Sequence, residues 1–134
     1  MTQSVRQTQQ YHLQKSITMN QKNSDKPWFI YLVRNKLDQL YCGITIDLQR
    51  RLFEHASNSP KCAKALKGKG PLVVMFCARV GNQSEALKLE HWLKKQTRQH
   101  KDQLIAGILA LPVEHELLGS RIIQTHINRQ ISQQ

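Results

Sequence analysis

Three short apolar runs, joined by turns and helical patterns, limit what this chain can fold into. Trp28 to Val33 is apolar and aromatic, as in a buried strand, and Asn35 to Asp38 is typical of a turn before a returning strand at Leu40 to Ile44. Pro71 to Ala78 is the third run. A bilayer span needs about twenty apolar residues, so we expect no membrane helix.

Helical signals occupy the segments between and after these runs. Thr45 is expected to cap the first helix, and Asn82 with Glu85 three residues later resembles a capping box. The expected helices cover residues 45–57, 82–95 and 98–111. The order β-β-α-β-α-α predicts an α+β domain: a small three-stranded antiparallel sheet flanked by helices.

The 134 residues suit one domain with extensions. We expect a disordered, basic, glutamine-rich tail over 1–27, a folded domain over 28–104, and a C-terminal helical extension over 105–134. Met19 leaves the true start open. The net charge is +11, and 28–104 alone carries fourteen Lys and Arg against six Asp and Glu. A folded domain with this excess suggests a polyanionic partner, most simply nucleic acid.

Cysteine usage excludes two further classes. Cys42, Cys62 and Cys77 form no C-x-x-C pair and leave an odd thiol, so neither a disulfide scaffold nor a zinc site is expected. The first thirty residues lack an apolar signal core. We therefore expect a cytoplasmic protein, without a small-molecule cofactor.

Glu90 does not fit a simple core helix. On a helical wheel it falls inside the apolar arc, among Ala86, Leu89 and Leu93. A carboxylate facing a core is costly unless it is paired or binds a metal. Either the side chain lies at the edge of the core and pairs with a nearby Lys or Arg, or it is a metal ligand.

Arg51 and His55 are a second unusual pair. They lie four residues apart, so they are neighbours on one side of the first helix, beside its apolar stripe. Such a pair can hold a phosphate, or it can be an ordinary solvated flank. Tyr31 and Tyr41 form a third pair: a hairpin centred on Lys36 would place them directly opposite each other on one face of the sheet. A simple aromatic cross-strand contact remains the alternative.

A basic segment follows the first helix. Its four lysines either form solvated surface or contact phosphates without sequence preference. They are Lys61, Lys64, Lys67 and Lys69.

The combination of these features resembles the GIY-YIG nuclease family. The strand Phe29-Ile30-Tyr31, the strand Tyr41-Cys42-Gly43, Arg51, His55 and Glu90 follow in the family's order over about residues 28–96. The linker at 63–72 is similar to the short stand-alone bacterial branch. The chain departs from the motif at Phe29, where the family has glycine, and at Cys42, where it has isoleucine. A late asparagine used by some members has no counterpart between residues 82 and 128.

The resemblance implies an endonuclease that hydrolyses phosphodiester bonds in DNA with one divalent ion, Mg²⁺ or Mn²⁺. Tyr31, Tyr41, Arg51 and His55 would be catalytic, Tyr31 being slightly preferred as general base, and Glu90 would bind the metal. Beside a cation and the metal ion, Tyr31 would lose its proton more readily. The DNA could be branched, nicked or single-stranded, with little sequence specificity.

Two other classes of function stay open at this point. The first is a non-catalytic nucleic-acid-binding module of the same fold, and the second is an adaptor protein whose C-terminal helices recruit a partner. A carboxylate in the apolar helix face argues against a mere binder, which has no use for it. The oligomeric state stays open as well.

Overall fold

A computed structural model describes residues 26–134; the expected tail over 1–27 lies almost wholly outside them. The elements follow in the order β-β-α-β-α-α-β-α, with one short 3-10 turn, η2. They are β1 (Phe29–Arg34), β2 (Leu40–Thr45), α2 (Leu48–Ala56), η2 (Lys64–Leu66), β3 (Val73–Arg79), α3 (Gln83–Lys94), α4 (Arg98–Ile105), β4 (Glu116–Leu117) and α5 (Ser120–Ser132).

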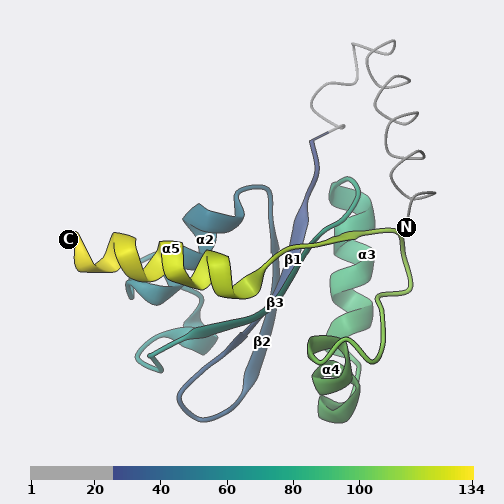
Figure 1. The fold of residues 1–134 in the computed structure, drawn as a ribbon, viewed down its shortest axis with the longest axis horizontal. Coiled ribbons are helices and arrows are strands. Elements are labelled where there is room, and N and C mark those ends of the chain that lie inside the picture. Colours follow the sequence, from purple (N-terminus) through teal and green to yellow (C-terminus); the bar gives the residue numbers. More distant parts are fainter. Residues whose placement is uncertain (1–25) are drawn as a thin grey trace.

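The sheet is antiparallel and has four strands, in the order β2-β1-β3-β4. The prediction of three strands is therefore wrong: the two-residue β4, from the segment after α4, pairs with the end of β3. Helices cover both faces, α2 and α5 on one side and α3 and α4 on the other (Figure 1). Two layers of helices around one small sheet bury its central strand on both faces.

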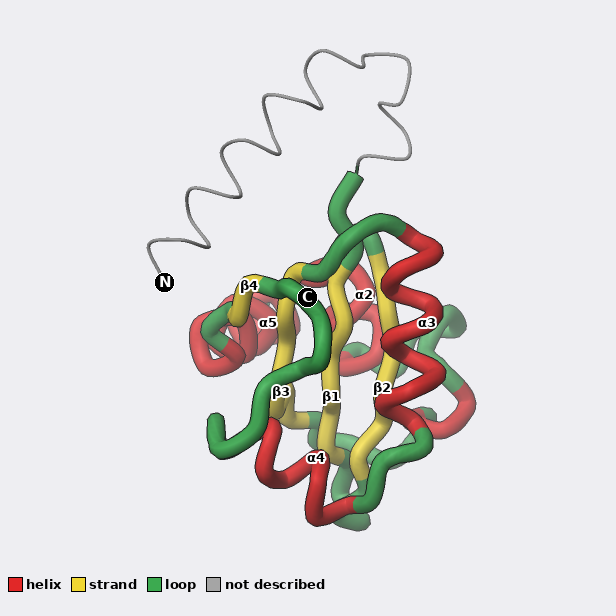
Figure 2. Tube along the Cα trace, turned by 90° about the vertical axis from the view of Figure 1, so that its right-hand side faces the viewer, coloured by secondary structure: helices red, strands yellow, loops and turns green. Residues whose placement is uncertain are grey.

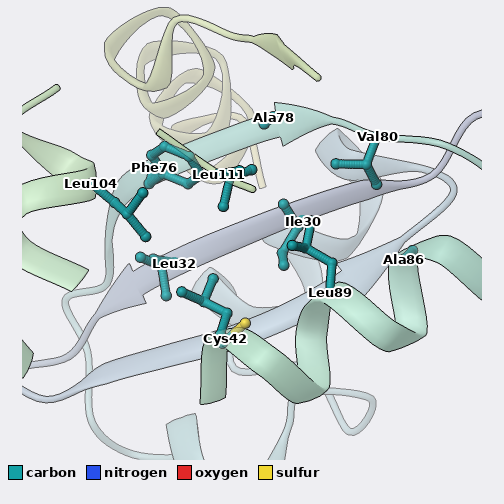
Figure 3. Close-up of a cluster of buried hydrophobic side chains, with 11 residues drawn as sticks. Ile30, Leu32, Cys42, Phe76, Ala78, Val80, Ala86, Leu89, Leu104 and Leu111 are labelled. Atoms are coloured by element: carbon teal, nitrogen blue, oxygen red, sulfur yellow. The ribbon is translucent and has the colours of Figure 1, made fainter. Parts of the chain in front are cut away.

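Strand β1 shows how the alternation of side chains builds two cores. Ile30 and Leu32 point to the α3/α4 face, and Tyr31 and Val33 point to the α2/α5 face. All four are at most 1% exposed. On the α3/α4 side, Leu89 points from α3 toward the sheet (Figure 3).

Most helix boundaries follow from local chemistry. The capping box of Asn82 and Glu85 is present at the start of α3, as predicted. The cap of α2 is not Thr45 but Asp47, whose carboxylate accepts the N–H of Arg50. Thr45 instead ends β2, and its hydroxyl accepts the N–H of Asp47. Helix α4 ends at Ile105, short of the predicted Leu111.

Helix α5 is packed against the rest of the domain. It contacts β3 and α2, and its Ile127 is 1% exposed. The side chain of Gln124 accepts the N–H of Val74, close to the bulge where the register between β1 and β3 shifts. In the described part of the chain, no helix is long and apolar enough to cross a membrane.

Candidate active site

The site residues gather around β2, which is an edge strand of the sheet. Helix α3 packs beside β2 on one face (Figure 2), and α2 follows β2 directly in the chain on the other face. Tyr31 comes from β1, Tyr41 from β2, Arg51 and His55 from α2, and Glu90 from α3. The five predicted residues therefore come from four elements that meet at one edge.

The two tyrosines share a face, as predicted, but not the predicted register. Tyr31 lies opposite Gly43, and Tyr41 lies opposite Val33. The tyrosines are therefore diagonal neighbours, with ring centroids 6.4 Å apart. The hairpin loop is two residues longer than a turn centred on Lys36. Both tyrosines therefore still lie on one face of the sheet, but each residue faces a cross-strand partner two positions further along the chain.

Gly43 has a steric role in this register. A Cβ at Gly43 would overlap the hydroxyl and ring of Tyr31. The absence of a side chain at Gly43 lets the Tyr31 ring lie across β2 and reach α2. The glycine in the second motif therefore has a direct physical reason.

Tyr31 and His55 form a buried hydrogen-bonded pair. The Tyr31 hydroxyl oxygen lies 2.8 Å from Nε2 of His55, and these residues are 1% and 2% exposed. The backbone N–H of Ala63 donates to Nδ1 of His55 at 3.3 Å. Because Nδ1 accepts, the neutral imidazole carries its proton on Nε2, and this N–H donates to the Tyr31 oxygen. His55 is thus part of the buried side of α2, and the solvated flank is excluded for it.

Burial decides the protonation of the pair. It lowers the pKa of His55 to about 4, with help from the positive charge of Arg51, so the imidazole is neutral near pH 7. Burial, and next the neighbouring Tyr41, raise the pKa of Tyr31, while Arg51 acts in the opposite direction. The expectation that Tyr31 ionises easily is therefore not met by the protein's own groups, because desolvation outweighs the single cation.

Arg51 is held in place by two acceptors. Its Nη1 donates to the Glu54 carboxylate at 2.9 Å and to the Lys61 carbonyl at 2.7 Å. Glu54 also accepts from Arg50 at 2.8 Å. The sequence analysis missed Glu54, although its spacing of three and four residues from the two arginines is a recognisable signal. The Arg51 side chain keeps 27% of its surface exposed, so it remains reachable by an anion.

Glu90 lies at the rim of the apolar face and not inside it. Its side chain is 19% exposed and its carboxylate lies 3.4 Å from Nζ of Lys94, one helical turn later. The negative charge of Glu90 contributes to raised pKa values at Tyr41 and Cys42, after burial as the main cause. Glu90 therefore belongs to the same electrostatic neighbourhood as Tyr41.

The four lysines are not equally placed. Lys61 is adjacent to the site, because its carbonyl binds Arg51. Lys64 and Lys67 are exposed around η2, and Lys69 is partly covered, with its carbonyl accepting the N–H of Lys36 in the hairpin turn. The segment thus borders the site at its first lysine and leads away from it after that.

Comparison with known proteins gives one consistent result. The family model for the GIY-YIG catalytic domain matches residues 27–103. A UPF0213 protein of Cronobacter sakazakii is 48% identical over 83 residues, covering 62% of this chain and 85% of the relative. The UPF0213 protein YhbQ of Escherichia coli K12 is 48% identical over 80 residues, covering 60% and 78%.

A solved structure is also similar to this chain. It is the solution NMR structure of the UPF0213 protein BH0048 from Bacillus halodurans, with 31% identity and a TM-score of 0.40. The match covers 60% of this chain and 83% of that protein.

Proposed function

The chain belongs to the GIY-YIG family, and on that premise we propose that it is an endonuclease that hydrolyses phosphodiester bonds in DNA with the help of a divalent ion. The observation that carries the proposal is the buried Tyr31–His55 hydrogen bond beside Arg51. A neutral imidazole that donates to a tyrosine leaves the tyrosine's own proton free for another partner. An apolar pair would pack as well, so this arrangement suits chemistry more than stability.

The donor set suits a hard cation held by few protein ligands. Among residues 26–134 no group of three His, Cys, Asp or Glu side chains could hold a metal. Mg²⁺ keeps several waters and is commonly bound by one or two carboxylates together with substrate phosphates. Glu90, partly exposed at the rim of the site, is such a carboxylate, and Mn²⁺ would fit the same oxygen. The bound ion would neutralise charge on the cleaved phosphate and the leaving oxygen.

Arg51 would bind the phosphate that is cleaved. Its planar guanidinium can donate two parallel hydrogen bonds to phosphate oxygens. Glu54 and the Lys61 carbonyl hold one end of the group, which fixes its orientation before substrate arrives. Such preorganisation lowers the cost of binding the transition state.

Tyr31 would act as general base toward the attacking water. Its phenolate oxygen would receive the His55 Nε2–H bond and the positive charge of Arg51, so both neighbours favour the ionised form. Tyr41 raises the pKa of Tyr31, so only one of the two would ionise at a time. His55 holds the Tyr31 oxygen in place and does not take its proton, which would pass to solvent before Tyr31 deprotonates the attacking water.

Glu90→Gln tests this proposal. The amide keeps the shape but is a poor ligand for a hard cation, so cleavage of plasmid or branched DNA in Mg²⁺ or Mn²⁺ should fall by at least about 10²-fold. The exposed Glu90–Lys94 pair is worth only about 0.3–0.5 kcal/mol, so the melting temperature should change little. DNA binding in EDTA should persist, because a negative charge beside the phosphate is removed.

Glu116→Gln is the matched control. Glu116 is also a carboxylate paired with a cation, Arg79 at 2.9 Å, but it lies on β4 at the other edge of the sheet. It should cut like the parent. If Glu90→Gln cut at the parental rate while losing stability, Glu90 would be a structural partner of Lys94 and not the metal ligand. If the parent protein bound DNA but did not cut it with either ion, a binding module would replace the nuclease proposal.

A further inference from the structure

A shallow groove opens beside Arg51, and most of its lining residues have no role in the hydrolysis described above. It runs from Trp28 along the end of β2 to the side of α2, and ends at Lys61. Arg51 lines this groove and also lies near both tyrosines. The groove is therefore a continuation of the candidate active site.

Part of the groove lining is apolar. It is formed by Trp28, Ile44 and Ile46. Trp28 and Ile44 are half-buried against the α3/α4 core, and Ile46 is 47% exposed. A single exposed isoleucine is ordinary, but an aromatic ring grouped with two isoleucines beside a phosphate-binding arginine is a surface on which a planar ring can lie.

The rest of the groove lining is mostly cationic. Arg50, Arg51 and Lys61 line it, against a single carboxylate, Glu54. The Arg50 side chain is 52% exposed, so its charge is available although Glu54 bonds one of its nitrogens. A groove lined by apolar surface together with an excess of positive charge is complementary to a nucleotide, which has a flat base and a charged phosphate.

We infer that this groove holds the nucleotide next to the cleaved phosphate, with its base against Trp28 and Ile46 and its outer phosphate near Arg50 and Lys61. The inference rests on the proposed function, and it adds a substrate class. A base inside a duplex is stacked and paired, so it reaches Trp28 and Ile46 only after it separates from its paired base. The groove therefore favours nucleotides that are already unpaired.

The test compares two strands that carry equal numbers of phosphates. One is a single strand of about twelve ordinary nucleotides, and the other is an equally long strand of abasic spacers. Binding is measured in EDTA with the full chain, so nothing is cut. Stacking of a base on a side chain contributes enough for about a tenfold preference or more for the strand with bases, and equal affinity for the two strands would overturn the inference.

Ile46→Asp locates the preference. The new charge repels the phosphates of both strands alike, so the ratio of the two affinities isolates the contact with the base. The ratio should fall toward one. Leu117→Asp is the matched control, since Leu117 is 61% exposed on β4 at the opposite edge of the sheet, and it should keep the parental ratio. Equal ratios in the two variants would place the base elsewhere.

Fluorescence gives a second readout that does not depend on an altered groove. The chain has two tryptophans, so Trp92→Phe leaves Trp28 as the sole tryptophan, and its emission is followed with excitation selective for tryptophan. The strand with bases should quench Trp28, and the spacer strand should not. Absence of quenching at saturation would contradict the contact.

The two proposals fail in different ways. If the groove inference is wrong, cleavage in Mg²⁺ or Mn²⁺ persists while both strands bind alike. If the nuclease proposal is wrong, no DNA is cut while the preference for bases and the quenching of Trp28 remain.

Discussion

Side chains from the same strand, β1, have different roles on the two faces of the sheet. Leu32 on β1 packs into the α3/α4 core, which is formed almost entirely by aliphatic and aromatic carbon (Figure 3). Tyr31, its neighbour in the chain, points to the α2/α5 face and meets His55 there. One face thus contributes packing, and the other gives up some packing to place a hydrogen-bonded polar pair at the β2 edge.

The polar face tolerates its buried groups because each has a partner. Within residues 26–134, no buried side-chain nitrogen or oxygen lacks a hydrogen bond. An unpaired buried polar group would cost about 1–3 kcal/mol. The comparison teaches that the Tyr31–His55 pair is stable only as a unit, whereas the apolar face depends on volume.

The largest effect on stability should come from the apolar face. Leu32→Ala removes a side chain that is 0% exposed, and such a change costs about 2–5 kcal/mol through lost burial and a cavity. Denaturant unfolding should show this loss in the free energy of unfolding. At low temperature, where the variant is still folded, it should cut DNA at near the parental rate. A specific loss of cutting with unchanged stability would show that the two faces are not separate in role.

Tyr31→Phe should mainly reduce cleavage, whereas Leu32→Ala should mainly reduce stability. The ring still packs, and removal of the hydroxyl leaves His55 Nε2 without its partner, which costs about 1–3 kcal/mol. Cleavage should fall by about 10²-fold or more if Tyr31 is the general base, while binding of DNA in EDTA persists. Tyr41→Phe measured in parallel is the comparison, and a larger loss there would transfer the role of base to Tyr41.

His55 should make the polar face sensitive to acid. Its pKa is about 4 in the folded protein and about 6.5 in an unfolded chain. Between these values the unfolded chain binds the proton more readily, so stability should fall as the pH drops from about 6.5 to 4, by at most about 3 kcal/mol. Denaturant unfolding of His55→Gln should show a flatter dependence over this window. The exposed His91→Gln should keep the parental slope, and a parental slope in His55→Gln would refute the assignment.

The smallest effect on DNA binding and cleavage should come from lysines that lie outside the two faces of the sheet. Changing Lys64 and Lys67 to Glu should weaken binding of all DNA sequences alike, and should lower the slope of log affinity against log salt by up to about two. Equal charge changes at Arg121 and Arg129 on α5 serve as the control. A changed sequence preference would mean that these lysines contact bases.

Local patterns in the sequence were sufficient for most elements. The β1–β2 hairpin, β3 and the capping box of α3 follow from apolar runs and from the chemistry of Asn82 and Glu85. Strand β4 could not be predicted, because two exposed residues have no pattern of their own and become a strand only through pairing with β3. The cap of α2 was misplaced because Thr45 and Asp47 both carry a suitable oxygen, and only the end of β2 decides between them.

The candidate site shows the same division. The resemblance to a nuclease family singled out Tyr31, Tyr41 and Glu90. The match to the family model confirms that the chain belongs to this family. Glu54 was missed although its partners Arg50 and Arg51 are close in sequence. The groove at Trp28 was not anticipated, because its lining residues are distant in sequence. The sequence left the hairpin loop open, because an odd loop places both tyrosines on one face and an even loop places them on opposite faces. The structure has an odd loop, with Tyr31 opposite Gly43.

The sequence by itself determined the period of each element, the excess of positive charge and the order of the chemical residues along the chain. These depend on neighbouring residues, and a periodic pattern specifies them without reference to the rest of the fold. The tertiary structure alone decided that Tyr31 bonds His55, that Arg51 is held by Glu54 and the Lys61 carbonyl, and that Glu90 stands at the rim. Hydrogen bonds and pKa values depend on distance and burial, and both are set by how helices from opposite faces meet at one edge of the sheet.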